Sequence, residues 1–253
     1  EELVAHLEAV EAGESVGAAP PDELIAATGV RLRHLRGKEL VYRREVSTVA
    51  ETDEYLFKHS MLRDVTYESV LRRKRRAYHG AVAAWLEGRS SERANEVAGL
   101  IAEHYARAGE DARAGLWSLR AGEQARATDA PGAAIAAYER ARELLPEDDA
   151  HAAARLAAEE GLGDVLQRQA RLPEATAAYE RMRERARAAG DGAAEARARL
   201  GAALAQETQG DFTAALQSAE QAEAMAREAC VDLERARALH RQGKILLRQG
   251  RPQ

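Results

Sequence analysis

Histidine, cysteine and paired carboxylates are the side chains from which this chain could build a catalytic or metal site. The seven histidines show no H-E-x-x-H spacing, and none stands near a serine or Cys230 in a way that suggests a triad. The carboxylate pairs Asp148–Asp149 and Glu159–Glu160 are typical of a loop and of a solvated helix face. We therefore expect no catalytic residue and no metal site in these 253 residues.

Phosphate chemistry would need a glycine-rich loop. The dipeptide Gly37-Lys38 is followed by Glu39 and has no glycine five residues before it, so it does not form a G-x-x-x-x-G-K-[ST] loop. No apolar strand ending in Asp, of the kind that holds Mg²⁺ in ATPases, is found either. We expect that this chain does not hydrolyse ATP by itself and needs no cofactor.

The basic run Arg72, Arg73, Lys74, Arg75 and Arg76 could contact DNA or lie on a solvated helix. Five successive cations on a helix point in several directions, so no single face concentrates them. The net charge of −5 gives no global electrostatic reason to bind nucleic acid. We expect nucleic acid to be an unlikely partner and keep a DNA-binding regulator as the alternative function.

The composition indicates helices. Hydrophobic residues make up 45% of the chain but aromatic residues only 4%, which suits alanine-rich helix packing. Charged residues reach 31% with both signs interspersed. The single cysteine cannot form an internal disulfide, which favours the cytoplasm. Because no run of 18 apolar residues and no signal peptide occurs, we expect no membrane association.

A repeat of 40 residues organises the second half of the chain. Gly163, Ala203 and Gly243 recur at this interval, and so do the small turn residues Ala170, Gly210 and Gly250. Ala175, Tyr179 and Met182 then take the three helix B positions of tetratricopeptide repeats, which are usually Ala, an aromatic residue and Ala, and Ala134, Tyr138, Ala141 and Pro146 repeat this spacing upstream. Each such hairpin buries its apolar face only by stacking on its neighbours. The pattern predicts an all-α solenoid whose helices are longer than those of the usual ~34-residue unit.

The first 88 residues do not show the 40-residue repeat. Apolar spacing predicts helices over Glu1–Val10, Glu23–Thr28 and Leu32–Glu39, with Gly29 ending the second. Strand-like segments follow at Leu40–Val46 and Tyr55–Phe57. Helices followed by a β-hairpin predict a winged-helix-like domain.

A helical pattern returns from Ser60 to Glu87, with Met61, Val65, Val70, Leu71, Val82 and Leu86 expected to face inward. We expect residues 1–88 to hold the winged-helix-like domain with a connecting helix, and residues 89–253 to hold tetratricopeptide-like repeats. The first hairpin is predicted over Val97–Arg107 and Ala114–Ala127, with Trp117 in its core. We expect the last repeat to be truncated and the chain to be a fragment of a longer protein.

The stretch Tyr55–Glu87 and the motif IAEHYARAGE at 101–110 resemble a known junction. They are similar to the winged-helix to tetratricopeptide region of STAND ATPases, the signal-transduction ATPases with numerous domains. The residues that match are Phe57, His59, Leu62, Arg63, Asp64, Tyr67, Glu68, Arg76, His79, Ala83, Glu87, Ala102, His104, Tyr105, Gly109, Ala121 and Ala125. The resemblance implies an upstream ATPase domain that uses ATP or ADP with Mg. It also implies an output domain such as an adenylate or guanylate cyclase, a protein kinase or a transcription activator.

Within this resemblance His59 is the candidate nucleotide contact. The segment FKHSMLRDV looks like the Met-His-Asp segment of related switches, in which the histidine reaches the ADP β-phosphate in the resting state. Lys58 and Ser60 replace the flanking Met and Asp. A histidine at a helix start can donate to a phosphate oxygen, or it can bond a backbone carbonyl in a purely structural role.

The repeat frame predicts a partner groove along the first helix of each hairpin. Its expected residues, which would run from mostly acidic to basic, are Glu160, Asp164 and Arg168, then Leu200, Leu204 and Glu207, then His240, Lys244 and Arg248. A protein, peptide or small effector of opposite charge order could lie along it. These positions could equally be ordinary solvated residues.

Three functions remain open from the sequence. The first is a regulatory, non-enzymatic region of a STAND ATPase, in which partner binding by the repeats is coupled through the winged helix to the nucleotide state. The second is a DNA-binding transcription regulator that uses the winged helix and residues 72–76. The third is a scaffold without a switch.

Overall fold

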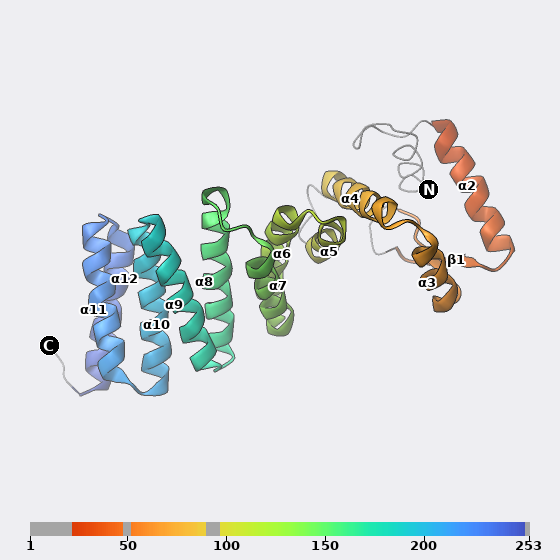
Figure 1. The fold of residues 1–253 in the computed structure, drawn as a ribbon. Coiled ribbons are helices and arrows are strands. Elements are labelled where there is room, and N and C mark those ends of the chain that lie inside the picture. Colours follow the sequence, from red (N-terminus) through yellow and green to blue (C-terminus); the bar gives the residue numbers. More distant parts are fainter. Residues whose placement is uncertain (1–21, 48–51, 90–96, 251–253) are drawn as a thin grey trace. The chain divides into compact units, whose positions relative to one another are not determined.

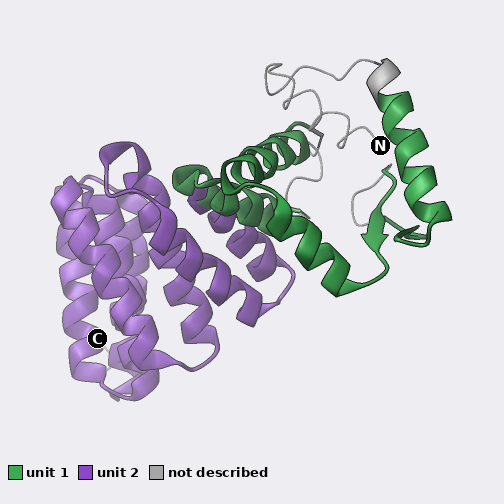
Figure 2. Ribbon diagram, turned by 45° about the vertical axis from the view of Figure 1, so that its right-hand side comes forward, with its two compact units in different colours: residues 1–114 green, residues 115–253 purple. Residues whose placement is uncertain are grey.

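The computed structural model describes residues 22–47, 52–89 and 97–250. The chain forms two compact units, residues 1–114 and residues 115–253 (Figure 2). Helices dominate the described residues, and their one sheet has two strands. The expected all-α fold with a small hairpin near the N-terminus is confirmed. The helix expected over Glu1–Val10 lies outside the described residues, and the boundary expected near residue 88 stays a prediction.

Unit 1 begins with a single helix where two were expected. Helix α2 runs through Asp22–Gly37 without a break at Gly29. Thr28 and Leu32 are buried, so the inward face continues past the glycine. A glycine inside a helix costs only ~1 kcal/mol relative to alanine, which such burial outweighs. The prediction that Gly29 ends a helix was therefore wrong.

The predicted hairpin follows α2. Strands β1 (Val41–Arg43) and β2 (Tyr55–Phe57) pair antiparallel, with Val41 opposite Phe57. Lys58, just after β2, forms an ion pair of 2.6 Å with Glu39, just before β1. The hairpin position was predicted correctly, whereas the full winged-helix assignment stays a prediction.

Three helices complete unit 1, namely α3 (Ser60–Ser69), α4 (Arg72–Arg89) and α5 (Ala98–Ala108). Val70 adopts an extended backbone between α3 and α4, so the helical pattern is interrupted there. Leu86 is buried as expected, but Met61, Val65 and Leu71 are exposed. The expected inward position of these three side chains was wrong: Met61 and Val65 lie on α3, which buries none of its residues, and Leu71 lies between α3 and α4.

A chain of polar rings joins these three helices. The Tyr67 hydroxyl on α3 lies 3.0 Å from Nε2 of His79 on α4, whose Nδ1 lies 3.0 Å from Nδ1 of His104 on α5. Only one proton can lie between the two Nδ1 atoms, so at least one of the two histidines is neutral in this arrangement. The Arg75 guanidinium stacks over the Tyr67 ring at 4.8 Å.

Unit 2 is an array of helical hairpins whose helices α8 to α12 stand side by side (Figure 1). The first helix of each hairpin is called here an A helix and the second a B helix. The A helices are α6 (Asp111–Ala127), which starts just before unit 2, α8 (Ala152–Arg168), α10 (Gly192–Gln209) and α12 (Asp232–Arg248). The B helices are α7 (Pro131–Leu144), α9 (Leu172–Ala189) and α11 (Phe212–Glu228). Helices of 14 to 18 residues account for the 40-residue step.

The tyrosine ring of a B helix packs against the A helix before it and the A helix after it in the chain. Tyr179 on α9 is 2% exposed and lies between Gly163 of α8 and Gly201 of α10. A Cβ atom at Gly163 would lie 2.7 Å from the Tyr179 ring, and one at Gly201 would lie closer still. Tyr138 on α7 is held in the same way by Gly122 of α6 and Gly161 of α8. The absence of a side chain at these glycines is therefore what allows each ring to enter the helix interface.

The turns that close the helices use a left-handed residue. Ala170 (φ 57°), Gly210 (φ 86°) and Gly250 (φ 69°) follow A helices at the positions where the sequence predicted turns. A left-handed residue lets the backbone N–H groups after a helix bond its last free carbonyl groups. At Gly210 and Asp211 these bonds reach Glu207 and Gln206. The small residues of the repeat thus end α8, α10 and α12 at the same place.

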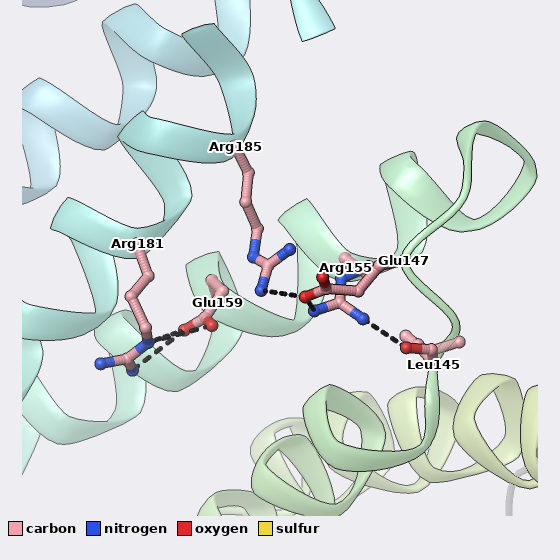
Figure 3. A network of polar contacts seen from close by, with 6 residues as sticks. All are labelled: Leu145, Glu147, Arg155, Glu159, Arg181 and Arg185. Carbon is pink, nitrogen blue, oxygen red and sulfur yellow. Dashed lines mark hydrogen bonds and ion pairs between the residues drawn. The ribbon is translucent and has the colours of Figure 1, made fainter. Parts of the chain in front are cut away.

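Ion pairs of the buried residues Glu159 and Arg155 connect α8 to α9 and to the loop before α8. Glu159 of α8 is 1% exposed and accepts from the Arg181 guanidinium of α9 at 3.0 Å (Figure 3). Arg155 of α8 donates to Glu147 at 2.8 Å and to the Leu145 carbonyl group, while Arg185 of α9 reaches Glu147 at 3.2 Å. Because buried charges are tolerated only when paired, these contacts fix the register between the helices.

The glycine positions can be tested by adding one methyl group. Gly201→Ala is expected to destabilise the protein by about 1–3 kcal/mol, because the new Cβ overlaps the buried Tyr179 ring. Gly243→Ala in α12 is the matched control, since a Cβ there meets no atom within 4 Å and should stabilise by roughly 0.5–1 kcal/mol. Urea unfolding followed by circular dichroism measures both changes. Equal effects of the two substitutions would contradict the packing described.

The histidine pair predicts a loss of stability in acid. Burial, and then neighbouring His79, lower the pKa of His104 to about 4, while burial and then Arg107 lower the pKa of His79. Unfolded histidine titrates near ~6.5, so the unfolded chain binds more protons below that pH. The stabilisation is complete above pH ~6.5 and is lost as the pH falls toward about 4. Allowing for solvent screening, the loss is on the order of 1–2 kcal/mol.

The measurement is the free energy of unfolding in urea between pH 7 and pH 4. His104→Gln should reduce the pH dependence, whereas His34→Gln, which changes an exposed histidine of α2, should leave it unchanged. A wild-type slope retained in His104→Gln would show that this pair does not control the acid response.

Candidate functional site

His59 lies where the sequence placed it, at the start of a helix. It is the N-cap residue of α3, with an extended backbone (φ −126°, ψ 127°), and its side chain makes no capping hydrogen bond. The imidazole is exposed. It therefore stands beside the free N–H groups of the first turn of α3, where an anion is electrostatically favoured. Its predicted contact with a nucleotide stays a prediction.

The basic run of α4 is dispersed around the helix. Arg75 is half-buried and stacks on Tyr67, whereas Arg72, Arg73 and Arg76 are exposed. Arg75 is thus engaged inside unit 1.

The predicted groove is partly assembled as one pocket in unit 2. Three of the predicted groove residues line it, namely Asp164 and Arg168 from α8 and Leu204 from α10, whereas their role in binding a partner stays a prediction. The pocket has a volume of about 320 Å³ and also includes Arg126, Gln167 and Thr208. We call these six residues the A-helix pocket, since all of them lie on the A helices α6, α8 and α10.

A hydrogen-bond network holds the acidic member of this pocket. The Tyr179 hydroxyl lies 2.9 Å from Asp164 Oδ1 and 3.1 Å from the Gln167 side-chain oxygen. Because a hydroxyl has one proton, it donates to the charged carboxylate, and the Gln167 amide fits better with its NH₂ group turned toward the hydroxyl. Arg126 donates to the other carboxylate oxygen, Oδ2, at 3.3 Å. Burial, followed by the charge of Asp164, raises the pKa of Tyr179.

The other predicted groove residues lie outside the pocket. Glu160 pairs with Arg197 of α10 at 3.2 Å, and Leu200 is half-buried. Glu207 is buried and pairs with Arg241 and Arg248 of α12 at 3.0 and 3.2 Å. His240 and Lys244 are exposed on α12. The expected acidic-to-basic order is thus altered, because ion pairs between neighbouring A helices engage Glu160, Asp164, Glu207 and Arg248.

Sequence reasoning missed Arg126, Gln167 and Thr208. Thr208 occupies the same place in the 40-residue step as Arg168 and could have been found from it. Arg126 follows Gly122 by four residues, as Gln167 follows Gly163. Aligning the repeats on the glycines that face tyrosine rings would therefore have placed both.

Two general features bound what the described part of the chain can do. Among the described residues, no three His, Cys, Asp or Glu side chains are grouped so that they could hold a metal ion. None of the helices in the described ranges combines the length and the apolar character that crossing a bilayer requires.

Comparisons with known proteins agree with the repeat geometry. Residues 153–228 match the family described as tetratricopeptide repeat. The array has a tetratricopeptide-type fold. The crystal structure of the apo form of RapI is similar to 75% of this chain, with a TM-score of 0.56 and 8% sequence identity. The chain spans 53% of the RapI chain, and at this identity the similarity concerns the fold alone. A comparison with curated protein sequences found no significant match.

The hydrogen bonds around Asp164 predict that Tyr179→Phe and Tyr138→Phe change the free energy of unfolding by different amounts. Tyr179→Phe removes the hydroxyl that donates to Asp164 and should lower the free energy of unfolding by about 1 kcal/mol. Tyr138→Phe is the matched control, because the Tyr138 hydroxyl makes no hydrogen bond with the described residues, and it should change stability by less than about 0.5 kcal/mol. Thermal and urea unfolding measure both. A larger effect at Tyr138 would contradict the assigned network.

Proposed function

We propose that the repeats of this chain bind a protein or peptide partner at the A-helix pocket. The observation that supports this most is the convergence of Asp164, Arg168 and Leu204 with Arg126 from three A helices. Neighbouring A helices present a series of side chains, and the pocket combines an apolar residue, Leu204, with charged residues, as recognition sites do. The tetratricopeptide-type fold is consistent with a binding role rather than a catalytic one.

We further propose that binding is coupled to a nucleotide-dependent switch. In this proposal residues 1–88 form the winged-helix-like domain and residues 89–253 the sensor repeats of a cytoplasmic STAND ATPase. The ATPase domain, with ATP or ADP and Mg, would lie elsewhere in the parent protein, and its output could be a nucleotide cyclase, a kinase or a transcription activator. The support is the resemblance of Tyr55–Glu87 and the exposed position of His59 at the start of α3.

Coupling requires that the partner bind one nucleotide state more tightly than the other. A partner with equal affinity for both states would shift nothing. His59 would favour the resting state by donating to an ADP phosphate, and partner binding would favour the state in which that contact is broken. DNA binding through the basic run of α4 is the less favoured function, since Arg75 is engaged with Tyr67.

Partner binding can be tested by selecting displayed 12-residue random peptides on the immobilised 253-residue chain. A related set of peptides should be enriched. These peptides should not bind the Leu204→Glu variant, because the substitution places a negative charge among the residues that line the pocket. Leu233→Glu alters an exposed leucine of α12 outside the pocket and should retain binding. Circular dichroism checks the fold of both variants. Enrichment of no peptide family, or equal loss in both variants, would count against the proposal.

The switch can be tested in the full-length protein. His59→Ala should raise the basal output activity, because the ADP-bound resting state loses one phosphate contact. His34→Ala removes another exposed histidine, on α2, and should leave basal activity unchanged. Unchanged basal activity of a folded His59→Ala protein would rule out the nucleotide contact while leaving partner binding intact.

A further inference from the structure

The A-helix pocket combines two guanidinium groups, those of Arg126 and Arg168, with one carboxylate. Its one carboxylate, Asp164, is engaged on both oxygens by Tyr179 and Arg126. The Thr208 hydroxyl donates back to the Leu204 carbonyl group of its own helix. Arg126 uses one of its five N–H groups in the pair with Asp164, and its side chain lines the pocket.

Arg168 is the unpaired cation of this site. It lines the pocket, is exposed, and makes no ion pair with any described residue. An Arg side chain without a partner offers a planar set of donors that matches a carboxylate. The charges of Arg126 and Asp164 compensate each other, so the pocket keeps the positive charge of Arg168. Leu204 adds an apolar surface beside these donors.

The positive character continues along the A helices. Lys244 of α12 stands 40 residues after Leu204 and 80 after Asp164, at the same place in the repeat. It is exposed and makes no ion pair with the described residues. The acids at the neighbouring predicted positions, Glu160 and Glu207, are paired with arginines. The cations that remain for a partner along this surface therefore include Arg168 and Lys244.

We propose that the partner is an acidic peptide segment that places a carboxylate between Arg126 and Arg168 and an aliphatic side chain on Leu204. This rests on the function proposed above and names the chemistry of its partner. A segment suits the site better than a small molecule, because Arg126 and Asp164 are each more than two-fifths exposed and the pocket would enclose a small ligand poorly. A second carboxylate of the same segment pairs with Lys244.

The spacing of the side chains in such a segment follows from the helices. Packed helices lie about 8–10 Å apart and an extended chain advances about 3.3 Å per residue. One residue in roughly three therefore meets each successive A helix. The expected pattern is an acidic residue opposite α8, an aliphatic residue about three positions on opposite α10, and a second acidic residue about three positions further opposite α12.

The test uses the peptides enriched by the selection on the 253-residue chain. Peptides with Asp or Glu near an aliphatic residue are expected, and fluorescence anisotropy should show about tenfold weaker binding of the best one to Arg168→Gln. Arg171→Gln is the matched control, because Arg171 is an exposed arginine that pairs with Glu174 outside the pocket. It should change affinity by less than about twofold. Replacing the acidic residue of the peptide by its amide should weaken binding to the wild type and remove the difference between wild type and Arg168→Gln.

The outcomes separate the two proposals. Enriched peptides that lose binding in Leu204→Glu but carry no acidic residue would overturn the acidic-partner proposal and retain the proposed function. Equal affinity of the best peptide for wild type and Arg168→Gln would overturn it as well. The absence of any enriched peptide would overturn both.

Discussion

The structure of unit 2 depends on the packing of tyrosine rings against glycine residues of the A helices. Tyr138 and Tyr179 each fill a space that two A helices leave open by having glycine there. The rings bring the backbones of neighbouring helices to fixed positions, because interiors packed at this density deform little. The register of α6, α8 and α10 follows from these contacts. Side chains within about two turns after these glycines on the same helices then meet in the A-helix pocket.

Charge pairing between neighbouring helices decides which groups are left for recognition. An alanine-rich array has few large apolar side chains, so arginine and glutamate fill part of its interior, as at Glu159 and Arg155. Buried pairs of this kind add specificity of register more than net stability. The same pairing extends to the A-helix surface, where it engages Glu160 and Glu207. Arg168 and Lys244 make no ion pair with the described residues, and the proposed partner chemistry rests on these two cations.

The sequence predicted the architecture better than the site. The 40-residue spacing of Gly163, Ala203 and Gly243 placed hairpins and turns correctly, because small residues recur where backbones approach. It also placed three of the six pocket residues. It missed Arg126, since the first hairpin departs from the 40-residue step and Arg126 matches Gln167 only when Gly122 is aligned with Gly163. Nor could it show that Glu160 and Glu207 are paired across helices, which depends on side-chain geometry. The sequence also led to the wrong prediction that a helix ends at Gly29. Burial of Thr28 and Leu32 outweighs the helix-breaking tendency of glycine there.

Amide hydrogen exchange of the 253-residue chain, measured with and without an enriched peptide, tests the central claim most directly. A pocket formed in advance by the tyrosine–glycine contacts should gain protection in the C-terminal turns of α6, α8 and α10, with little change in α9. Protection confined to other segments, or a gain spread evenly over all helices of unit 2, would contradict the claim that the A helices present a preformed binding surface.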